Sequence, residues 1–340
     1  MAPQLESTLP LELERHIFIL TALSYPYSIP KLLLVAWRVT HWLEPILYRT
    51  LVVSSSVLLP KDLPVCSIEI IFNILRNKPT AFLQQSICNL LLDGTPEVQT
   101  KIILSTCVGV ENLCLLRRNR HYFDAFGIST APPLARLTHL HCAFDELFKW
   151  EHTGEFLRTS FPQLSHLEFF GQLPAQQIVA PLAALPRLTH LAFPTSYDSH
   201  LHASIYAQIL DACALLRLIV LHSAISPTAS SPLGVLGAQD IRCIVILWHE
   251  YNPDIRAADW LSGIQLGVDF WSLADDLVTK RMTGTTDRTL PTSSAERDLI
   301  LLLGNEYTLR GDHLVCAVDI DAEYLIHQPF DNLLVYFISL

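Results

Sequence analysis

The sequence is poor in charged residues, and poorest in positive charge. Of its 340 residues, 16% are charged and 50% are hydrophobic, whereas a typical globular chain is about 25% charged. This composition argues against disorder over most of the length, because ample material exists for a buried core. Lys and Arg total 23 against 33 Asp and Glu. Since no basic stripe appears, we expect no nucleic-acid partner.

Several other signals are missing from the sequence. The eight cysteines include no CxxC pair and no zinc-ligand spacing, and there is no N-glycosylation sequon. No apolar run reaches the ~18 residues of a membrane-spanning helix. The first residues carry Glu6, Glu12 and Glu14 where a secretory signal has an apolar stretch. We expect an intracellular protein, in the cytoplasm or the nucleus, with reduced thiols and no membrane partner.

Motifs that carry enzyme chemistry are also missing. The sequence contains no phosphate loop, dinucleotide-binding glycine pattern, nucleophile elbow or HExxH zinc motif. The carboxylates of Asp319–Glu323 lie close together, but no partner motif accompanies them. We therefore expect no catalytic residues and no cofactor.

Three near-copies of one seven-residue phrase are present instead. RLTHLHC begins at Arg136, QLSHLEF at Gln163 and RLTHLAF at Arg187, so the copies lie 27 and 24 residues apart. Each copy carries a histidine at its fourth position. These histidines are His139, His166 and His190.

The phrase belongs to a longer repeat, L-x-x-L-x-φ, in which φ is apolar. Seven copies occur at intervals of 23 to 28 residues. Their apolar positions are Ile87/Leu90/Leu92, Val110/Leu113/Leu115, Leu137/Leu140/Cys142, Leu164/Leu167/Phe169, Leu188/Leu191/Phe193, Leu216/Ile219/Leu221 and Ile241/Ile244/Ile246. Over residues 68–250 the chain resembles leucine-rich repeat proteins, whose period is ~20–29 residues. The family's asparagine after each strand is missing, which indicates an irregular solenoid.

Each repeat predicts one short strand and one helix. In the strand, side chains alternate between faces, so the two apolar residues of L-x-φ point inward. The stretches TPEVQTKIILSTC, AQQIVAPLAAL and ASIYAQILDACALL have apolar residues at helical spacing. Neither element buries its apolar face alone, whereas stacked units form a continuous core. We therefore predict an α/β solenoid of short parallel strands alternating with helices.

The repeat places the three histidines on the concave face of this solenoid. They directly precede an inward residue, so we expect their side chains to point outward from the sheet. We predict that this face is open and binds a partner protein. Its predicted binding residues are Asn89, Asn112, His139, His166, Glu168 and His190.

A shared metal ion is the alternative for these histidines. Neighbouring strands lie ~4.7–4.9 Å apart, and Glu168 is a candidate fourth ligand. Zinc, however, needs nitrogens at ~2.0–2.1 Å and a shaped pocket, which an open surface does not provide. Duplication of one phrase accounts for the histidines without any chemistry, so we expect no metal site.

The first fifty residues predict a helical unit. Ser7 or Thr8 is a candidate cap for a first helix with Pro10 in its first turn. A second helix, expected over residues 30–37, is apolar on every side. A unit this small cannot bury two apolar faces by itself, so either the repeats or a second protein covers one. The apolar stripe of the first helix comprises Leu9, Leu13, Ile17 and Leu20.

Four features of this stretch resemble an F-box domain. They are a Leu-Pro-x-Glu opening, an Ile-Phe pair, a Leu-Val pair and an aromatic–Arg element that leads into a strand. The matching residues are Leu9, Pro10 and Glu12, then Ile17–Phe18, Leu34–Val35 and Tyr48–Arg49. The segment GVDFWSLADDLVTKR at Gly267–Arg281 resembles the closing segment of large fungal families of F-box-like proteins.

F-box domains dock on the small adaptor subunit of cullin-based ubiquitin ligases, and many carry leucine-rich repeats that hold the substrate. The resemblance therefore implies a substrate-recognition subunit without catalytic activity of its own, with the adaptor and a target protein as partners. The adaptor-binding residues that it implies are Leu9, Pro10, Ile17, Leu32, Val35 and Trp37. The alternative is a non-catalytic scaffold in which the first helices only cap the solenoid.

The sequence accordingly divides into four parts. Residues 1–53 are the F-box-like helical domain, and residues 54–282 are the solenoid. Residues 283–298 are polar and predict a linker or loop. Residues 299–340 form a C-terminal tail whose pattern suggests strands.

Overall fold

One parallel sheet organises the molecule. The computed structural model describes residues 9–54, 65–116, 134–143, 154–170, 178–195, 203–223, 240–247 and 253–284. Within them, nine parallel strands lie in the order β2-β1-β3-β4-β5-β6-β7-β8-β9. They are β1 (Thr50–Ser54), β2 (Val65–Cys66), β3 (Asn89–Asp93), β4 (Asn112–Leu116), β5 (His139–Ala143), β6 (His166–Phe170), β7 (His190–Thr195), β8 (Leu218–Ser223) and β9 (Cys243–Leu247). The predicted α/β solenoid is confirmed.

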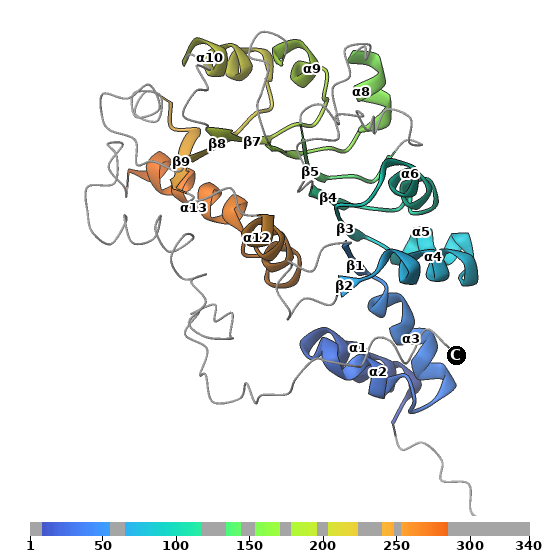
Figure 1. Ribbon diagram of the computed structural model, residues 1–340. Helices are drawn as coiled ribbons and strands as arrows, with labels where there is room; N and C mark the ends of the chain where they lie inside the picture. The colour runs from blue at the N-terminus through green and yellow to red at the C-terminus, as the bar shows by residue number, and fades with distance from the viewer. Residues whose placement is uncertain are drawn as a thin grey trace, which may run out of the picture.

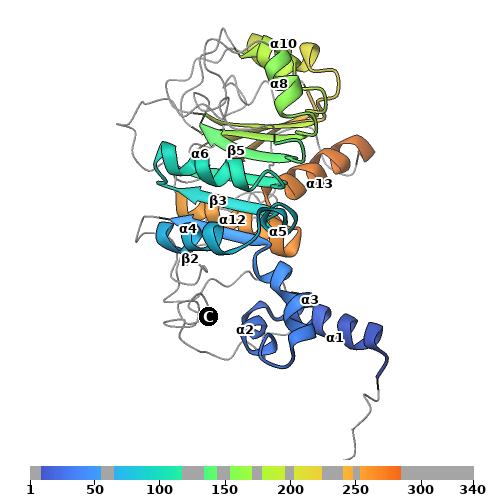
Figure 2. The same ribbon diagram turned by 90° about the vertical axis from the view of Figure 1, so that its right-hand side faces the viewer.

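Helices on one side of the sheet connect successive strands and form an outer layer (Figures 1 and 2). They are α4 (Ile68–Asn77), α5 (Thr80–Ser86), α6 (Glu97–Thr106), α8 (Gly154–Ser160), α9 (Val179–Ala183) and α10 (Ala203–Ala212). Their apolar residues pack on the inward residues of the strands and build the main core. Six inward strand residues are fully buried: Leu90, Leu113, Leu140, Leu167, Leu191 and Ile219.

The strand register confirms the first six repeats and corrects the seventh. Ile219 of β8 pairs with Cys243 of β9, so Cys243 faces the main core, while Ile244 and Ile246 face the opposite side. The predicted phrase Ile241/Ile244/Ile246 is one residue out of phase, and such a shift exchanges the two faces of a strand. Both sides of β9 are apolar, which is why the pattern did not fix its phase.

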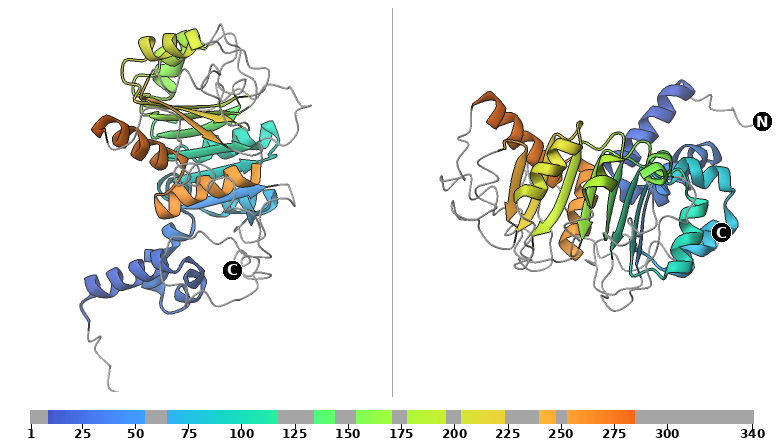
Figure 3. Two further views of the ribbon diagram at one scale, coloured as in Figure 1. Left: turned by 90° about the vertical axis from the view of Figure 1, so that its left-hand side faces the viewer. Right: turned by 90° about the horizontal axis from the view of Figure 1, so that it is seen from above.

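Two late helices, α12 (Pro253–Leu266) and α13 (Phe270–Thr283), lie across the concave side of the sheet (Figure 1; Figure 3, left). α12 packs through Ala257, Trp260 and Leu261 on residues of β1, β3, β4 and β6. α13 packs through Phe270 and Trp271 on residues of β7, β8 and β9. The expectation of an open concave surface is therefore wrong, because these helices convert that face into a second buried layer.

The N-terminal unit lies beside the β1–β2 edge of the sheet (Figure 1). It consists of α1 (Leu11–Ser24), the 3-10 turn η1 (Pro26–Ser28), α2 (Ile29–Leu32) and α3 (Trp37–Leu47). Its own small core comprises Ala22, Ile29, Val39 and Leu43. The unit meets the solenoid where Tyr48 packs edge-on against Phe82 of α5, with centroids 5.7 Å apart. Close by, Lys78 and Glu44 form an ion pair at 2.5 Å.

Two local features of this unit differ from the prediction. The expected second helix is interrupted, because Ala36 is extended (φ −163°, ψ 152°) between α2 and α3. The Thr40 hydroxyl donates to the Leu33 carbonyl at 2.8 Å, which satisfies an acceptor that the interruption leaves free. Pro10 occupies the N-cap position of α1 without a side-chain cap, and the candidate caps Ser7 and Thr8 lie outside the described residues.

Two of the predicted domain limits fall within the described residues and can be compared with the helices and strands there. β1 belongs to the sheet, although the sequence assigned most of it to the N-terminal domain. α13 ends at Thr283 and is capped by Gly284, whose φ of 72° is a left-handed conformation that suits glycine. Residues 285–340, with most of the predicted linker and the whole tail, lie outside the described residues. The division into domains stays a prediction.

Candidate functional site

The three repeated histidines lie side by side on the concave face. His139 is the ladder partner of His166, and His166 is that of His190. Their rings stack with centroids 4.1 and 4.0 Å apart and interplanar angles of 17° and 9°. Trp271 of α13 packs edge-on against His166 and His190, with centroids 5.4 and 5.8 Å away. The row is thus covered by α13, and His190 is buried.

A hydroxyl residue before each histidine fixes its tautomer. The pairs are Thr138–His139, Ser165–His166 and Thr189–His190, with Oγ–Nδ1 distances of 2.9, 2.9 and 2.7 Å. Each hydroxyl donates its single proton to a backbone carbonyl of the preceding repeat, as Thr138 does to Glu111 at 3.0 Å. It must therefore accept from Nδ1–H of the histidine. A neutral ring held in this way has its lone pair on Nε2.

This stacking does not bring three nitrogens to one metal ion. Lone pairs of parallel imidazoles point in the same direction, whereas zinc needs nitrogens that converge at ~2.0–2.1 Å. Within the described residues, no group of three or more His, Cys, Asp or Glu side chains is placed to hold a metal. Burial, reinforced by neighbouring imidazoles, lowers the pKa of His139 to about 4 and that of His166 to about 2.

Glu168 forms the centre of a buried ionic cluster beneath α12. Its side chain accepts a hydrogen bond from His141 Nδ1 at 2.6 Å and pairs with the guanidinium of Arg256. His222 Nε2 lies 3.3 Å from the same carboxylate. Arg256 also lies over the Phe170 ring, 4.9 Å from its centroid. The cluster thereby ties α12 to β5, β6 and β8.

Burial controls protonation in this cluster. It lowers the pKa of His141 and of His222 to about 3 each, and that of Arg256 to about 10. It raises the pKa of Asp259 well above its usual value, and the nearby Asp269 adds to that rise. At neutral pH the imidazoles of His141 and His222 are therefore uncharged. The charged groups of the cluster are those of the ion pair between Arg256 and Glu168.

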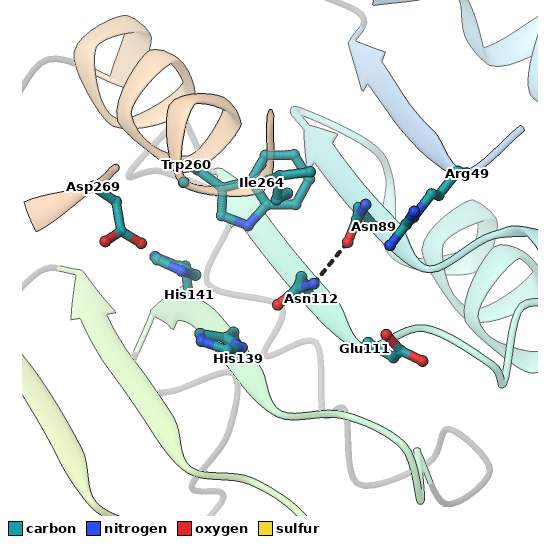
Figure 4. Close-up of a pocket in the computed structure, with 10 residues that line it drawn as sticks. Arg49, Asn89, Glu111, Asn112, His139, His141, Trp260, Ile264 and Asp269 are labelled. Atoms are coloured by element: carbon teal, nitrogen blue, oxygen red, sulfur yellow. Dashed lines mark hydrogen bonds between the residues drawn. The ribbon is translucent and has the colours of Figure 1, made fainter. Parts of the chain in front are cut away.

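A polar pocket of about 230 Å³ opens where α12 crosses β3, β4 and β5 (Figure 4). A hydrogen-bonded ladder lies along it: Asn112 Nδ2 donates to Asn89 Oδ1 at 2.6 Å, and Asn89 Nδ2 donates to Thr50 Oγ1 at 2.9 Å. The other lining residues are Arg49, Glu111, His139, His141, Trp260, Gly263, Ile264 and Asp269. Polar side chains from the sheet therefore face the indole of Trp260 across this space.

The apolar stripe that begins at Leu9 and continues along α1 is exposed. Leu9, Leu13, Ile17 and Leu20 have exposed fractions of 46%, 52%, 50% and 50%. Leu34 and Val35, which follow α2, are 69% and 59% exposed, and Trp37, the first residue of α3, is 76% exposed. The ion pair of Arg38 with Glu14 at 2.7 Å joins α3 to α1. Exposed apolar patches of this kind mark interaction surfaces, so we call these seven residues the N-terminal apolar face.

The structure places the predicted residues as follows. Five of the six predicted adaptor-binding residues are exposed: Leu9, Pro10, Ile17, Val35 and Trp37. The sixth, Leu32, is half-buried against the N-terminal core. All six predicted concave-face residues lie on that face, but Asn89, Glu168 and His190 are buried, which corrects the expectation that they are open to solvent. Partner binding by either set stays a prediction.

Sequence reasoning missed several residues of these sites, among them His141, His222, Arg256 and Trp260. The repeat held a signal for the first, because His141 and Glu168 occupy the same position, two residues after the repeated histidine. Polar side chains there interrupt an otherwise apolar row. No repeat position marks Arg256 or Trp260, which come from a helix outside the repeats.

Comparisons with known proteins say little about this chain. No family model matches it, and no curated protein is similar to it. Among solved structures, the chain is similar to the leucine-rich repeat-containing protein LegL7 from Legionella pneumophila, at 15% identity and a TM-score of 0.34. That similarity covers 56% of this chain and 68% of the other. The leucine-rich-repeat-like fold follows from the strand order, register and repeat phase of this chain itself.

Proposed function

We propose that the chain is a non-catalytic recognition subunit of a cullin-type ubiquitin ligase. Its N-terminal apolar face docks on the adaptor subunit, and its solenoid binds the target protein. The observation that carries this proposal is the exposed stripe of α1. Apolar residues at helical spacing normally face a core, and here Leu13 and Ile17 lie at that spacing yet stay half exposed.

Docking an adaptor on this face has a clear energetic basis. Burying one leucine or isoleucine side chain contributes about 1.5–3 kcal/mol, and the face offers several. Trp37 is the most exposed of them, and large aromatic side chains are frequent anchors at interfaces. The ion pair of Arg38 with Glu14 lies beside this apolar surface as part of its polar surroundings.

The proposal is tested by binding the purified full chain to a purified adaptor. Ile17→Asp places a charge in the middle of the N-terminal apolar face and is expected to weaken binding at least tenfold. Val98→Asp is the matched control, because Val98 is 69% exposed on α6, at the outer layer of the solenoid. It is expected to leave the affinity unchanged.

Two results would contradict adaptor docking. One is no binding by the unaltered chain under conditions in which a standard F-box protein binds. The other is equal loss of affinity in Ile17→Asp and Val98→Asp. Unfolding midpoints of both variants should match the unaltered chain, since both positions are exposed.

A second function, in which the N-terminal helices cap the solenoid, is supported by the contact of Tyr48 with Phe82 and the ion pair of Lys78 with Glu44. A chain that begins at Thr50 would then unfold at lower urea concentration than the full chain. If the full chain also fails to bind the adaptor, capping alone accounts for the unit. Unchanged unfolding of the shorter chain would remove this reading.

A further inference from the structure

The indole of Trp260 is the first sign that the polar pocket holds a ligand. Its side chain is buried, with the residue 3% exposed, and Nε1 has no hydrogen-bond partner among the described residues. Figure 4 shows the indole nitrogen directed from α12 toward Asn112 across the pocket. Buried donors without an acceptor are rare in folded proteins and costly. A ligand that supplies an acceptor there would satisfy this N–H.

Hydrogen-bond acceptors lie on the opposite wall of the pocket. Asn112 uses its NH₂ group on Asn89, which leaves Oδ1 as an acceptor. His139 and His141 both use Nδ1, toward Thr138 and Glu168 respectively. Since burial keeps both rings neutral, with pKa values of about 4 and 3, each has a lone pair on Nε2. A matching ligand therefore also carries hydrogen-bond donors.

The pocket is lined by one positive and one negative side chain that do not pair with each other, so a ligand with one charge of each sign would match them. Glu111 is already paired with Arg136. Arg49 and Asp269 have no ion-pair partner among the described residues. Figure 4 shows them at opposite ends of the pocket, with the guanidinium of Arg49 beside Asn89 and the carboxylate of Asp269 beside His141. One positive and one negative group thus remain to be matched.

We propose that this pocket binds a small zwitterion of the amino-acid class. The carboxylate of the ligand lies toward Arg49 and Trp260 Nε1, and its three ammonium protons are donated to Asn112 Oδ1, one imidazole Nε2 and Asp269. This assignment does not depend on adaptor docking, because no residue of the N-terminal apolar face lines the pocket.

The size of the pocket agrees with this class of ligand. A volume of about 230 Å³ is below the ~300–1,000 Å³ of pockets for drug-sized molecules, yet well above the ~10–15 Å³ that one water needs. Gly263 of α12 lets the side chain of Asp269 pack close to this helix at one end of the pocket, since a Cβ there would lie 2.6 Å from Asp269 Oδ2. The pocket therefore suits one small polar molecule.

The test is ligand binding to the full chain, measured by thermal shift and then by calorimetry. The first probes are the twenty protein amino acids, each tested separately. For the tightest binder, two analogues follow: the amine that lacks the carboxylate and the acid that lacks the ammonium group. We expect at least one amino acid to raise the melting temperature, and each analogue to bind at least tenfold more weakly.

Three variants connect binding to the pocket. Arg49→Gln and Asp269→Asn each remove one charge, and Asn still caps α13 in place of Asp269. Trp260→Phe removes the N–H and keeps an aromatic ring. Each is expected to weaken binding at least tenfold. Arg158→Gln, at an exposed position of α8, is the matched control and is expected to bind like the unaltered chain.

Several outcomes would overturn the assignment. They are no thermal shift with any amino acid, equal binding by either singly charged analogue, and unchanged affinity in both Arg49→Gln and Asp269→Asn. If Trp260→Phe fails to fold, Arg49→Gln still decides, because Arg49 is exposed and makes no side-chain hydrogen bond or ion pair with the described residues.

Discussion

Removing the charge of Glu168 tests whether the buried ionic cluster ties α12 to the sheet. Glu168 and Arg256 are 1% and 5% exposed, so Glu168→Gln keeps the shape of the side chain and removes the negative charge that pairs with the buried guanidinium of Arg256. Breaking a buried pair in this way costs about 3–5 kcal/mol. At about 2–4 °C per kcal/mol for a domain of this size, the melting temperature should fall by about 6–20 °C.

Two further variants make this prediction specific, with urea and thermal unfolding followed by circular dichroism. Asp276→Asn breaks the exposed pair of Lys280 with Asp276, whose side chains are 47% and 53% exposed, and should cost less than about 1 kcal/mol. The double variant Glu168→Leu/Arg256→Met replaces both charges by apolar groups and should recover part of the loss, because His141 Nδ1 still loses its acceptor. If Glu168→Gln is no more destabilising than Asp276→Asn, the reasoning is refuted.

The remaining predictions concern pH and close packing. The free energy of unfolding should fall as pH drops from about 6.5 to 4. Histidines of the unfolded chain bind protons near pH ~6.5, whereas His139 and His141 have folded pKa values of about 4 and 3. Urea midpoints that stay unchanged across that range would disprove this. Asp259, whose folded pKa is raised, acts with the opposite sign, so Asp259→Asn should steepen the fall measured by the same titration. Gly109→Ala should lower the free energy of unfolding by about 1–3 kcal/mol or more, because the added Cβ would lie 1.7 Å from the Gln84 carbonyl oxygen. An unfolding midpoint equal to that of the unaltered chain would contradict this, because it would show that the backbone shifts at little cost.

The repeat in the sequence carried most of the information on the sheet. Leu140, Leu167 and Leu191 recur at one position and are fully buried in the main core, so spacing alone predicted that the repeats stack with these residues facing inward. The same spacing aligned the three histidines. It failed at β9, where Ile244 and Ile246 face the second layer while Cys243 faces the main core, because apolar residues on both faces leave the phase undefined.

The repeat could not predict that α12 and α13 cover the concave face of the sheet. Trp260 and Trp271 reach that face from helices outside the repeat, and the pairing of Arg256 with Glu168 joins segments far apart in the sequence. Long-range contacts of this kind leave no periodic trace. The apolar character of Phe270 and Trp271 indicates burial, yet it does not indicate which surface buries them.

Hydrogen–deuterium exchange of the full chain, alone and with the purified cullin adaptor, tests adaptor docking most directly. We predict slower exchange in α1 and in the segment from Leu33 to Trp37 when the adaptor is present, because these backbone segments carry the N-terminal apolar face. Exchange in α12 and α13, which already cover the concave face, should not change. An exchange pattern in α1 that is the same with and without the adaptor would contradict adaptor docking by this face.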